Sequence, residues 1–145
     1  MGAVRITGHN LHQFAWEPAQ LDRIESLVRK ELIEIGGQSV LLIDMIGNII
    51  LNCDDGHYDK DIYTIAALAS ANFAAVNSMA EIVGEQDFSL LFHKGKNENV
   101  HFTKIDEDYL LVTIFGSDVA LGDLRMRLAG VVRKILLITR QPRPE

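Results

Sequence analysis

The sequence predicts an α/β fold: a three-layer sandwich with a central, five-stranded, mainly antiparallel sheet and helices on both faces. Three observations support this prediction. The runs "SVLLIDM" (39–45) and "YLLVTIF" (109–115) are almost wholly apolar, which is typical of strands buried on both faces. Three longer segments have apolar or small residues at helical spacing. Along the chain the order is helix, two strands, helix, three strands, helix.

The composition is that of one ordinary globular domain, with 145 residues, 48% hydrophobic and 23% charged. The formal net charge of −6 argues against nucleic acid as the main partner, because phosphate binding needs clustered Lys and Arg. A single cysteine, Cys53, excludes an internal disulfide and suits a reducing compartment. The first residues lack the pattern of a signal peptide or a lipid anchor, so we expect a cytoplasmic protein.

The first half of the chain begins with residues 1–17, which we expect to form an N-terminal arm because they show no clean periodicity. A helix then opens at Pro18 and ends at Gly36-Gly37. Its apolar positions recur at helical spacing: Leu21, Ile24, Leu27, Val28, Leu32 and Ile35. Residues 39–45 and 48–53 are predicted to form a hairpin around the turn at 46–48.

The second half begins with an uncharged helix that starts at Ile62 and ends near Val83-Gly84. Strands are predicted at 87–94, 100–105 and 109–115, with turn residues at 95–99. Gly116-Ser117-Asp118 is predicted to cap a last helix through about Ile138, followed by a flexible tail at 140–145. The apolar strands 39–45 and 109–115 should be central neighbours.

No pattern in the sequence forms a catalytic site. Gly95-Lys96 lacks the spacing of a phosphate-binding loop, and no serine lies in a Gly-x-Ser-x-Gly turn. His9 and His12 lack a third metal ligand, and the Asp54-Asp55-Gly56 run lacks the glutamate of a calcium loop. His93 and His101 face each other across a predicted hairpin, either as a shared site or as polar residues on the wetter side of outer strands. We therefore expect no enzyme activity, no metal and no cofactor.

The uncharged helix raises the question of what covers it. Its residues Thr64, Ser70, Asn72, Asn77 and Ser78 make it too polar for a membrane span. One stripe should pack on the sheet: Ile62, Ile65, Ala66, Ala69, Phe73, Val76 and Ala80. The opposite stripe also carries no charge: Thr64, Ala67, Leu68, Ala71, Ala75, Ser78 and Ile82. Either the helix is sunk in an intramolecular core, or other chains cover its outer side; the amphipathic character of the other two helices favours other chains.

The run "VLLIDMIGNIILNC", the Ala-rich second helix and "GEQDFSLLFHKGKNENVHFTKIDEDYLLVTIF" resemble the roadblock-type dynein light chain superfamily, and within it the bacterial gliding-motility proteins. The resemblance covers a domain at about residues 18–139. It implies strand order 2-1-5-4-3, with the first and third helices on one face of the sheet and the second on the other.

The resemblance further implies a homodimer. Third strands would pair across the two sheets, and second helices would lie side by side and present a platform to a Ras-like (MglA-like) small GTPase. Expected GTPase-binding positions are Thr64, Leu68, Ala71, Ala75 and Ser78. Expected dimer-interface positions are Ser70, Ala74, Asn77, Phe88, Ser89, Leu90, Leu91 and Phe92.

The function implied by the resemblance is regulation of the GTPase, with stimulation of GTP hydrolysis. The exposed stripe of the second helix has no arginine, which agrees with repositioning of the GTPase's own residues rather than insertion of an arginine finger. Two alternatives stay open. One is a passive scaffold of the same superfamily, and the other is a small-ligand sensory module.

Overall fold

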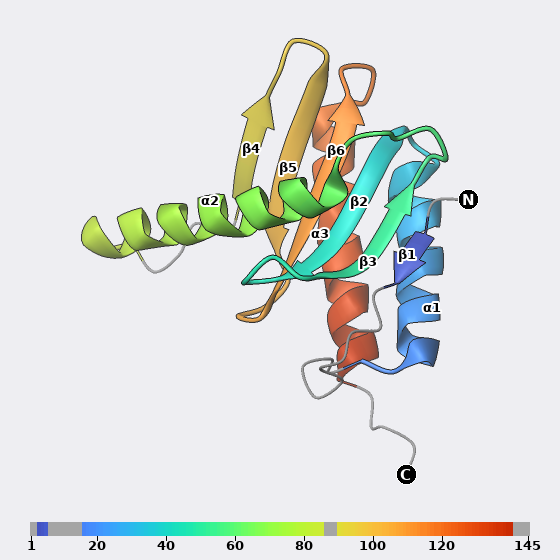
Figure 1. Ribbon diagram of the computed structural model, residues 1–145, viewed down its shortest axis with the longest axis horizontal. Coiled ribbons are helices and arrows are strands. Elements are labelled where there is room, and N and C mark those ends of the chain that lie inside the picture. The colour runs from blue at the N-terminus through green and yellow to red at the C-terminus, as the bar shows by residue number, and fades with distance from the viewer. Residues whose placement is uncertain (1–2, 6–15, 86–89, 141–145) are drawn as a thin grey trace.

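The computed structural model describes residues 3–5, 16–85 and 90–140. Its sheet is antiparallel, with the strand order β1-β3-β2-β6-β5-β4. Helices α1 and α3 cover one face of the sheet and α2 crosses the other (Figure 1). The strands are β1 (Ala3–Arg5), β2 (Gly37–Asp44), β3 (Ile49–Asp54), β4 (Leu90–Lys94), β5 (Glu98–Lys104) and β6 (Tyr109–Gly116). The helices are α1 (Pro18–Val28), the π-helical turn η2 (Arg29–Ile33), α2 (Ile62–Ile82) and α3 (Leu121–Thr139).

The five predicted strands are present, and in their own numbering they have the order 2-1-5-4-3. The α/β three-layer sandwich is therefore confirmed, with β2 and β6 as the central neighbours. The N-terminal arm adds a sixth strand: β1 pairs with the outer edge of β3, from Ala3 opposite Cys53 to Arg5 opposite Leu51. A strand of three residues is too short to show an alternating pattern, which is why the sequence did not predict it.

The sheet has an apolar layer on each side because neighbouring residues of a strand point to opposite faces. Val40 and Leu42 of β2 pack under α1 and α3, whereas Leu41 and Ile43 pack under α2. The larger layer includes Ile24, Val28, Leu111, Phe115, Leu124, Leu128 and Ile135. The smaller layer includes Ile49, Ala66, Ala69, Phe73, Phe102, Leu110 and Val112. Both central strands are thus buried on both faces, as their composition predicted.

The first helix begins as predicted, with Pro18 in its first turn and the Glu17 N–H donating to the Gln20 side chain at 2.7 Å. It ends differently from an ordinary α-helix, because the Glu34 N–H donates to the Arg29 carbonyl at 3.0 Å to close a π turn. Leu32, which lies within this turn, is fully buried. Periodicity alone did not reveal it, since one π turn shifts the pattern by a single residue.

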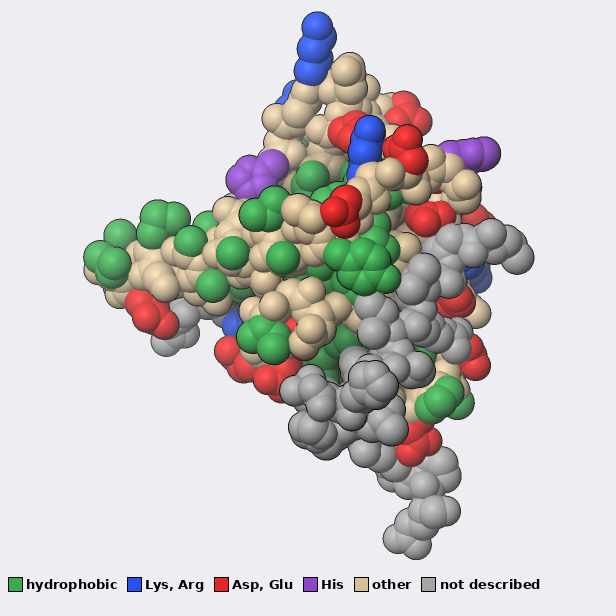
Figure 2. Space-filling view, viewed as in Figure 1, with side chains coloured by type: hydrophobic (Ala, Val, Ile, Leu, Met, Phe, Trp, Pro, Cys, Tyr) green, Lys and Arg blue, Asp and Glu red, His purple; other side chains and the backbone are tan. Residues whose placement is uncertain are grey.

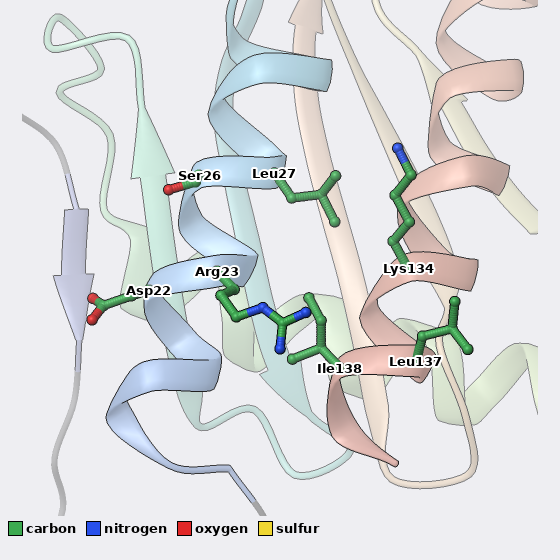
Figure 3. A pocket seen from close by; sticks show the side chains of 7 residues that line it. All are labelled: Asp22, Arg23, Ser26, Leu27, Lys134, Leu137 and Ile138. Atoms are coloured by element: carbon green, nitrogen blue, oxygen red, sulfur yellow. The ribbon is translucent and has the colours of Figure 1, made fainter. Parts of the chain in front are cut away.

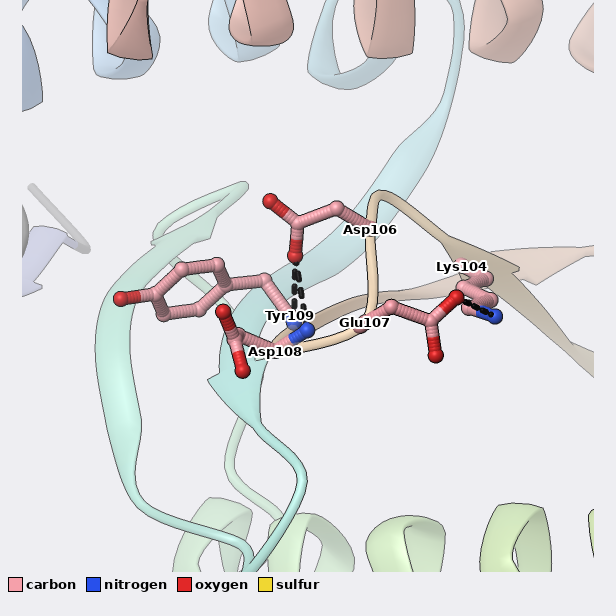
Figure 4. Close-up of polar contacts among 5 residues, drawn as sticks. All are labelled: Lys104, Asp106, Glu107, Asp108 and Tyr109. Carbon is pink, nitrogen blue, oxygen red and sulfur yellow. Dashed lines mark hydrogen bonds and ion pairs between the residues drawn. The ribbon is translucent and has the colours of Figure 1, made fainter.

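Two carboxylates organise the tight turns of the sheet. Asp44 accepts from the Ile46 and Asn48 N–H groups at 3.0 and 2.9 Å, in a turn where Gly47 adopts φ +93°. Asp106 accepts from the Asp108 and Tyr109 N–H groups at 2.8 and 3.0 Å between β5 and β6 (Figure 4). Such Asx contacts stabilise a short loop through hydrogen bonds within the loop itself.

Two predicted boundaries are wrong. The last helix was predicted to be capped at Gly116-Ser117-Asp118. It begins instead at Leu121, and its N-cap residue is Ala120, which makes no side-chain hydrogen bond. The turn between β4 and β5 is also shorter than predicted, because Glu98 and Asn99 belong to β5. There the Gly95 N–H donates to the Glu98 carbonyl at 2.9 Å and closes the hairpin early.

Candidate functional site

The start of α2 is fixed by Asp61. Its carboxylate accepts from the N–H groups of Tyr63 and Thr64 at 3.1 and 3.2 Å and from the Thr64 hydroxyl at 2.6 Å. The Thr64 hydroxyl, then the Thr64 N–H, lower the pKa of the Asp61 carboxyl. The hydroxyl of Thr64, a predicted GTPase-binding residue, is therefore already engaged within its own chain.

The predicted sheet-facing stripe of α2 packs on the sheet from Ile62 to Phe73, whereas Val76 and Ala80 are not part of that apolar layer. Ala66, Ala69 and Phe73 are buried against β2, β6 and Phe102 of β5. Beyond Phe73 no residue of the helix belongs to this apolar layer. Figure 1 shows the consequence: the C-terminal half of α2 runs past β4 and extends beyond the sheet.

The outer face of α2 comprises Thr64, Ala67, Leu68, Ala71, Ala75, Ser78 and Ile82, and all seven residues are exposed. Leu68, at its centre, is 64% exposed. Figure 2 shows this side of the helix, which carries no charged side chain between the charged residues near its N-terminus and the acidic residue near its C-terminus. The five predicted GTPase-binding residues thus share one exposed, uncharged surface.

By length and composition, α2 is the one helix among the described residues that could cross a membrane. Of its most apolar 18-residue window, 28% is buried within the chain. The outer face, which is uncharged but rich in alanine and serine, belongs to the part of the helix that the fold of a single chain leaves uncovered.

The two flanks of α2, between its sheet side and its outer face, differ in character. One flank holds Ser70, Ala74, Asn77 and Glu81, at positions i, i+4, i+7 and i+11. The other flank holds Asn72, Val76, Met79 and Val83, and here Met79 and Val83 are 54% and 67% exposed. The apolar flank is therefore the second one, whereas the residues predicted for the dimer interface lie on the flank that carries Glu81.

Ser70 has a partner within its own chain. It is buried, donates to the Ala67 carbonyl at 2.9 Å and lies directly under the turn at Gly47. Its small size lets the β2–β3 turn approach the helix, a role that its position in the sequence did not disclose.

Strand β4 forms the edge of the described sheet and pairs with β5 on its inner side, from Leu90 opposite Thr103 to Lys94 opposite Asn99. Of the predicted interface residues, Phe88 and Ser89 lie outside the described residues, and Leu90 and Leu91 are described by their backbone only. The Phe92 side chain lies on the face of the sheet that α1 and α3 cover, and its ring centroid is 6.0 Å from that of Phe115 on β6.

The two histidines of the predicted hairpin do not share a site. His93 pairs with Val100 and His101 with Phe92, so their side chains point to opposite faces of the sheet. His93 is exposed beside α2, with Nε2 3.1 Å from Asn72 Nδ2. His101 is fully buried under α3, so the prediction of a wetter surface is wrong for it. The hairpin was predicted correctly, but its register was wrong by one residue, because His93 lies opposite Val100 rather than His101.

A groove of about 560 Å³ separates α1 from α3 (Figure 3). Arg23 and Leu27 of α1 point toward Leu137 and Ile138 of α3, whereas Asp22 and Ser26 point to the outer side of α1. At the other end of this face, Arg127 bridges Glu31 and Asp123 at 3.3 and 3.4 Å.

No group of three His, Cys, Asp or Glu side chains able to hold a metal occurs in the described part of the chain. Cys53 is buried. Asp54 and Asp55 accept from the N–H groups of Gly56 and His57 at 2.7 and 2.8 Å, which makes them turn residues. His9 and His12 lie outside the described residues.

Residues 38–115 match the Roadblock/LC7 domain, a span that runs from β2 through α2 and the β4 edge to β6. The chain belongs to the Roadblock/LC7 family. No curated protein sequence matches it.

Solved structures with the same fold include MglB proteins. The gliding protein MglB from Thermus thermophilus matches with a TM-score of 0.78 and 22% identity, over 88% of this chain and 96% of that one. Myxococcus xanthus MglB matches with a TM-score of 0.74 and 24% identity, over 85% and 97%. An MglB described with a tetrameric arrangement matches with a TM-score of 0.77 and 23% identity, over 86% and 93%. At these identities the likeness shows a shared Roadblock/LC7 fold.

Proposed function

We propose that this Roadblock/LC7 protein is a homodimeric, non-enzymatic, cytoplasmic regulator that binds a Ras-like small GTPase and stimulates its GTP hydrolysis. The observation that carries the proposal is the outer face of α2, an exposed and uncharged surface centred on Leu68 and Ala71. A charge-free surface of small and apolar side chains is inexpensive to desolvate, which favours a protein partner.

The dimer brings two such faces together. The outer edge of β4, the last strand of the described sheet, can pair with β4 of a second copy. The part of α2 that extends beyond the sheet then lies over the partner. The exposed side chains of Met79 and Val83 make their flank the better contact between the two helices. The MglB structure described with a tetrameric arrangement supports self-association through this fold.

Stimulation has to act through the GTPase's own residues. Phosphoryl transfer needs an oriented water and stabilised charge, which an inserted arginine supplies in many activators. The outer face of α2 offers alanine, serine and threonine but no arginine. Its role is to hold the GTPase's mobile segments in the reactive arrangement, which requires a rigid surface more than a reactive group.

The test is single-turnover GTP hydrolysis by small GTPases of the same organism, with and without the dimer. We expect acceleration by the natural chain, loss of binding and acceleration with Ala71→Arg, and no change with Ala19→Arg, which places the same charge on an exposed position of α1. Binding without acceleration identifies a passive scaffold. Absence of binding to every small GTPase tested overturns the proposal.

A further inference from the structure

One face of β5 carries polar residues where the packing of α3 calls for apolar ones. Asn99, His101 and Thr103 alternate along the strand under α3 and are buried, as is Thr113, the neighbour of His101 on β6. Three buried side-chain atoms in the described residues lack a hydrogen-bond partner: Asn99 Oδ1, His101 Nε2 and Thr113 Oγ1. Buried polar atoms are nearly always paired, so three in one cluster require an explanation.

A cavity of about 300 Å³ lies beside this cluster, between β5 and α3. His101 and Thr103 line its sheet side, and Leu128, Ala129 and Val132 line its helix side. The volume is at the lower end of the range for small-molecule sites, and the combination of an apolar wall with a few polar groups is typical of them.

The charged residues that line the cavity are both cations. Arg125 lies with its guanidinium carbon 6.0 Å from the centroid of the Phe92 ring, and Lys104 is held by Glu107 at 2.7 Å. No carboxylate is among the described residues of the lining. His101 is neutral at neutral pH, because burial, and then Arg125, lower its pKa to about 4. The cavity therefore favours a ligand with one negative charge.

We propose that this cavity binds a small aliphatic carboxylate, with the carboxylate held between the Arg125 guanidinium and His101 Nε2 and the alkyl part against Leu128 and Val132. His101 Nδ1 lies 3.0 Å from Thr103 Oγ1, which fixes the orientation of the ring, and Nε2 is the ring atom left without a partner. When the Thr103 hydroxyl donates to Nδ1, the proton of the neutral ring resides on Nε2, which then donates to the ligand.

The site goes beyond the proposed regulation of a GTPase and does not depend on it. It lies under α3, on the face of the sheet opposite α2, so a carboxylate bound there leaves the outer face of α2 free. It gives the domain a capacity for small-ligand sensing in addition to protein binding.

The experiment follows the ¹⁵N-labelled His101 ring of the full chain by NMR during titration with sodium isobutyrate at constant ionic strength. We expect a saturable shift with a Kd of the order of 1 mM, as suits a ligand of few atoms, and a ring protonated at Nε2. Isobutylammonium chloride, of similar shape and opposite charge, should produce no saturable shift. Inorganic phosphate should bind at least about tenfold more weakly, because it lacks the apolar part.

Matched variants locate the ligand. Arg125→Gln should raise the Kd about tenfold through loss of a charge-assisted contact, whereas Arg133→Gln, the same change at an exposed position of α3, should leave it within about twofold. Ala129→Phe should abolish binding by filling the cavity. The proposal is overturned if isobutyrate gives no saturable shift, if phosphate or the amine binds equally well, or if Arg125→Gln or Ala129→Phe leaves the Kd unchanged.

Discussion

At the scale of single residues, His101 links the stability of the domain to pH. Its pKa is near 6.5 in an unfolded chain and about 4 when folded, because burial and then Arg125 disfavour the imidazolium. The unfolded state therefore takes up a proton first as the pH falls. The contribution of the neutral ring to stability is complete above pH 6.5 and is lost progressively toward pH 4, to an extent on the order of 2–3 kcal/mol.

Exchange of this ring for a neutral amide tests the linkage. The unfolding free energy of the natural chain should fall between pH 6.5 and 4, and we expect this fall to be about 2 kcal/mol smaller in His101→Gln. Urea denaturation at a series of pH values measures the difference. His93→Gln, an exchange at the exposed histidine of the same hairpin, should retain the dependence of the natural chain. An undiminished pH dependence in His101→Gln would show that other groups produce it.

Neighbouring residues of α2 should respond oppositely to arginine. Ala71 is exposed on the outer face, so Ala71→Arg can reach water, and its unfolding free energy should change by less than about 0.5 kcal/mol. Phe73 is buried against the sheet, so Phe73→Arg buries an unpaired charge and should unfold the domain. Circular dichroism melts compare the two. If Ala71→Arg also unfolds the chain, the outer face is part of the core rather than a docking surface.

At the scale of elements, α2 and the β2–β3 turn depend on each other. Gly47 has φ +93°, and a Cβ there would lie 3.0 Å from Ser70 Oγ and 3.1 Å from Ala67 Cα. Gly47→Ala should therefore cost about 2–3 kcal/mol of stability, from backbone strain together with displacement of the helix. Gly56→Ala is the control, since φ is +87° and no atom lies within 4 Å, and should cost about 1 kcal/mol. Equal losses in urea denaturation would mean that the turn does not support α2.

The sequence could predict the strands and helices in which an apolar pattern repeats over several residues. The apolar runs at 39–45 and 109–115 predicted the central strands, and the stripe through Ala66, Ala69 and Phe73 predicted the packed side of α2. Single events were not predictable. Three such features are the short strand β1, the π turn at Arg29 and the strand register that separates His93 from His101. Each depends on local hydrogen bonding, which produces no repeating pattern in the sequence.

At the scale of the whole molecule, the candidate site was predicted in part. The outer face of α2 followed from helical periodicity, because exposure repeats every three or four residues. The difference between its two flanks did not, because it depends on where the sheet ends beneath the helix, which Figure 1 shows and the sequence does not state. The buried cluster at His101 was visible only as alternating polar residues, Asn99, His101 and Thr103, in a strand assumed to be wet.

The arrangement of the whole molecule predicts a dimer at micromolar concentration, with a particular flank of α2 in the contact. Met79→Glu places a charge beside the exposed Val83 on the apolar flank and should raise the dissociation constant of the dimer by about tenfold or more. Asn77→Glu places the same charge on the flank that already carries Glu81 and should leave the dimer intact. Sedimentation equilibrium distinguishes a dimer from the 16.2 kDa chain. A natural chain that sediments as a monomer at high concentration would refute the dimer, and dissociation by Asn77→Glu alone would place the contact on the other flank.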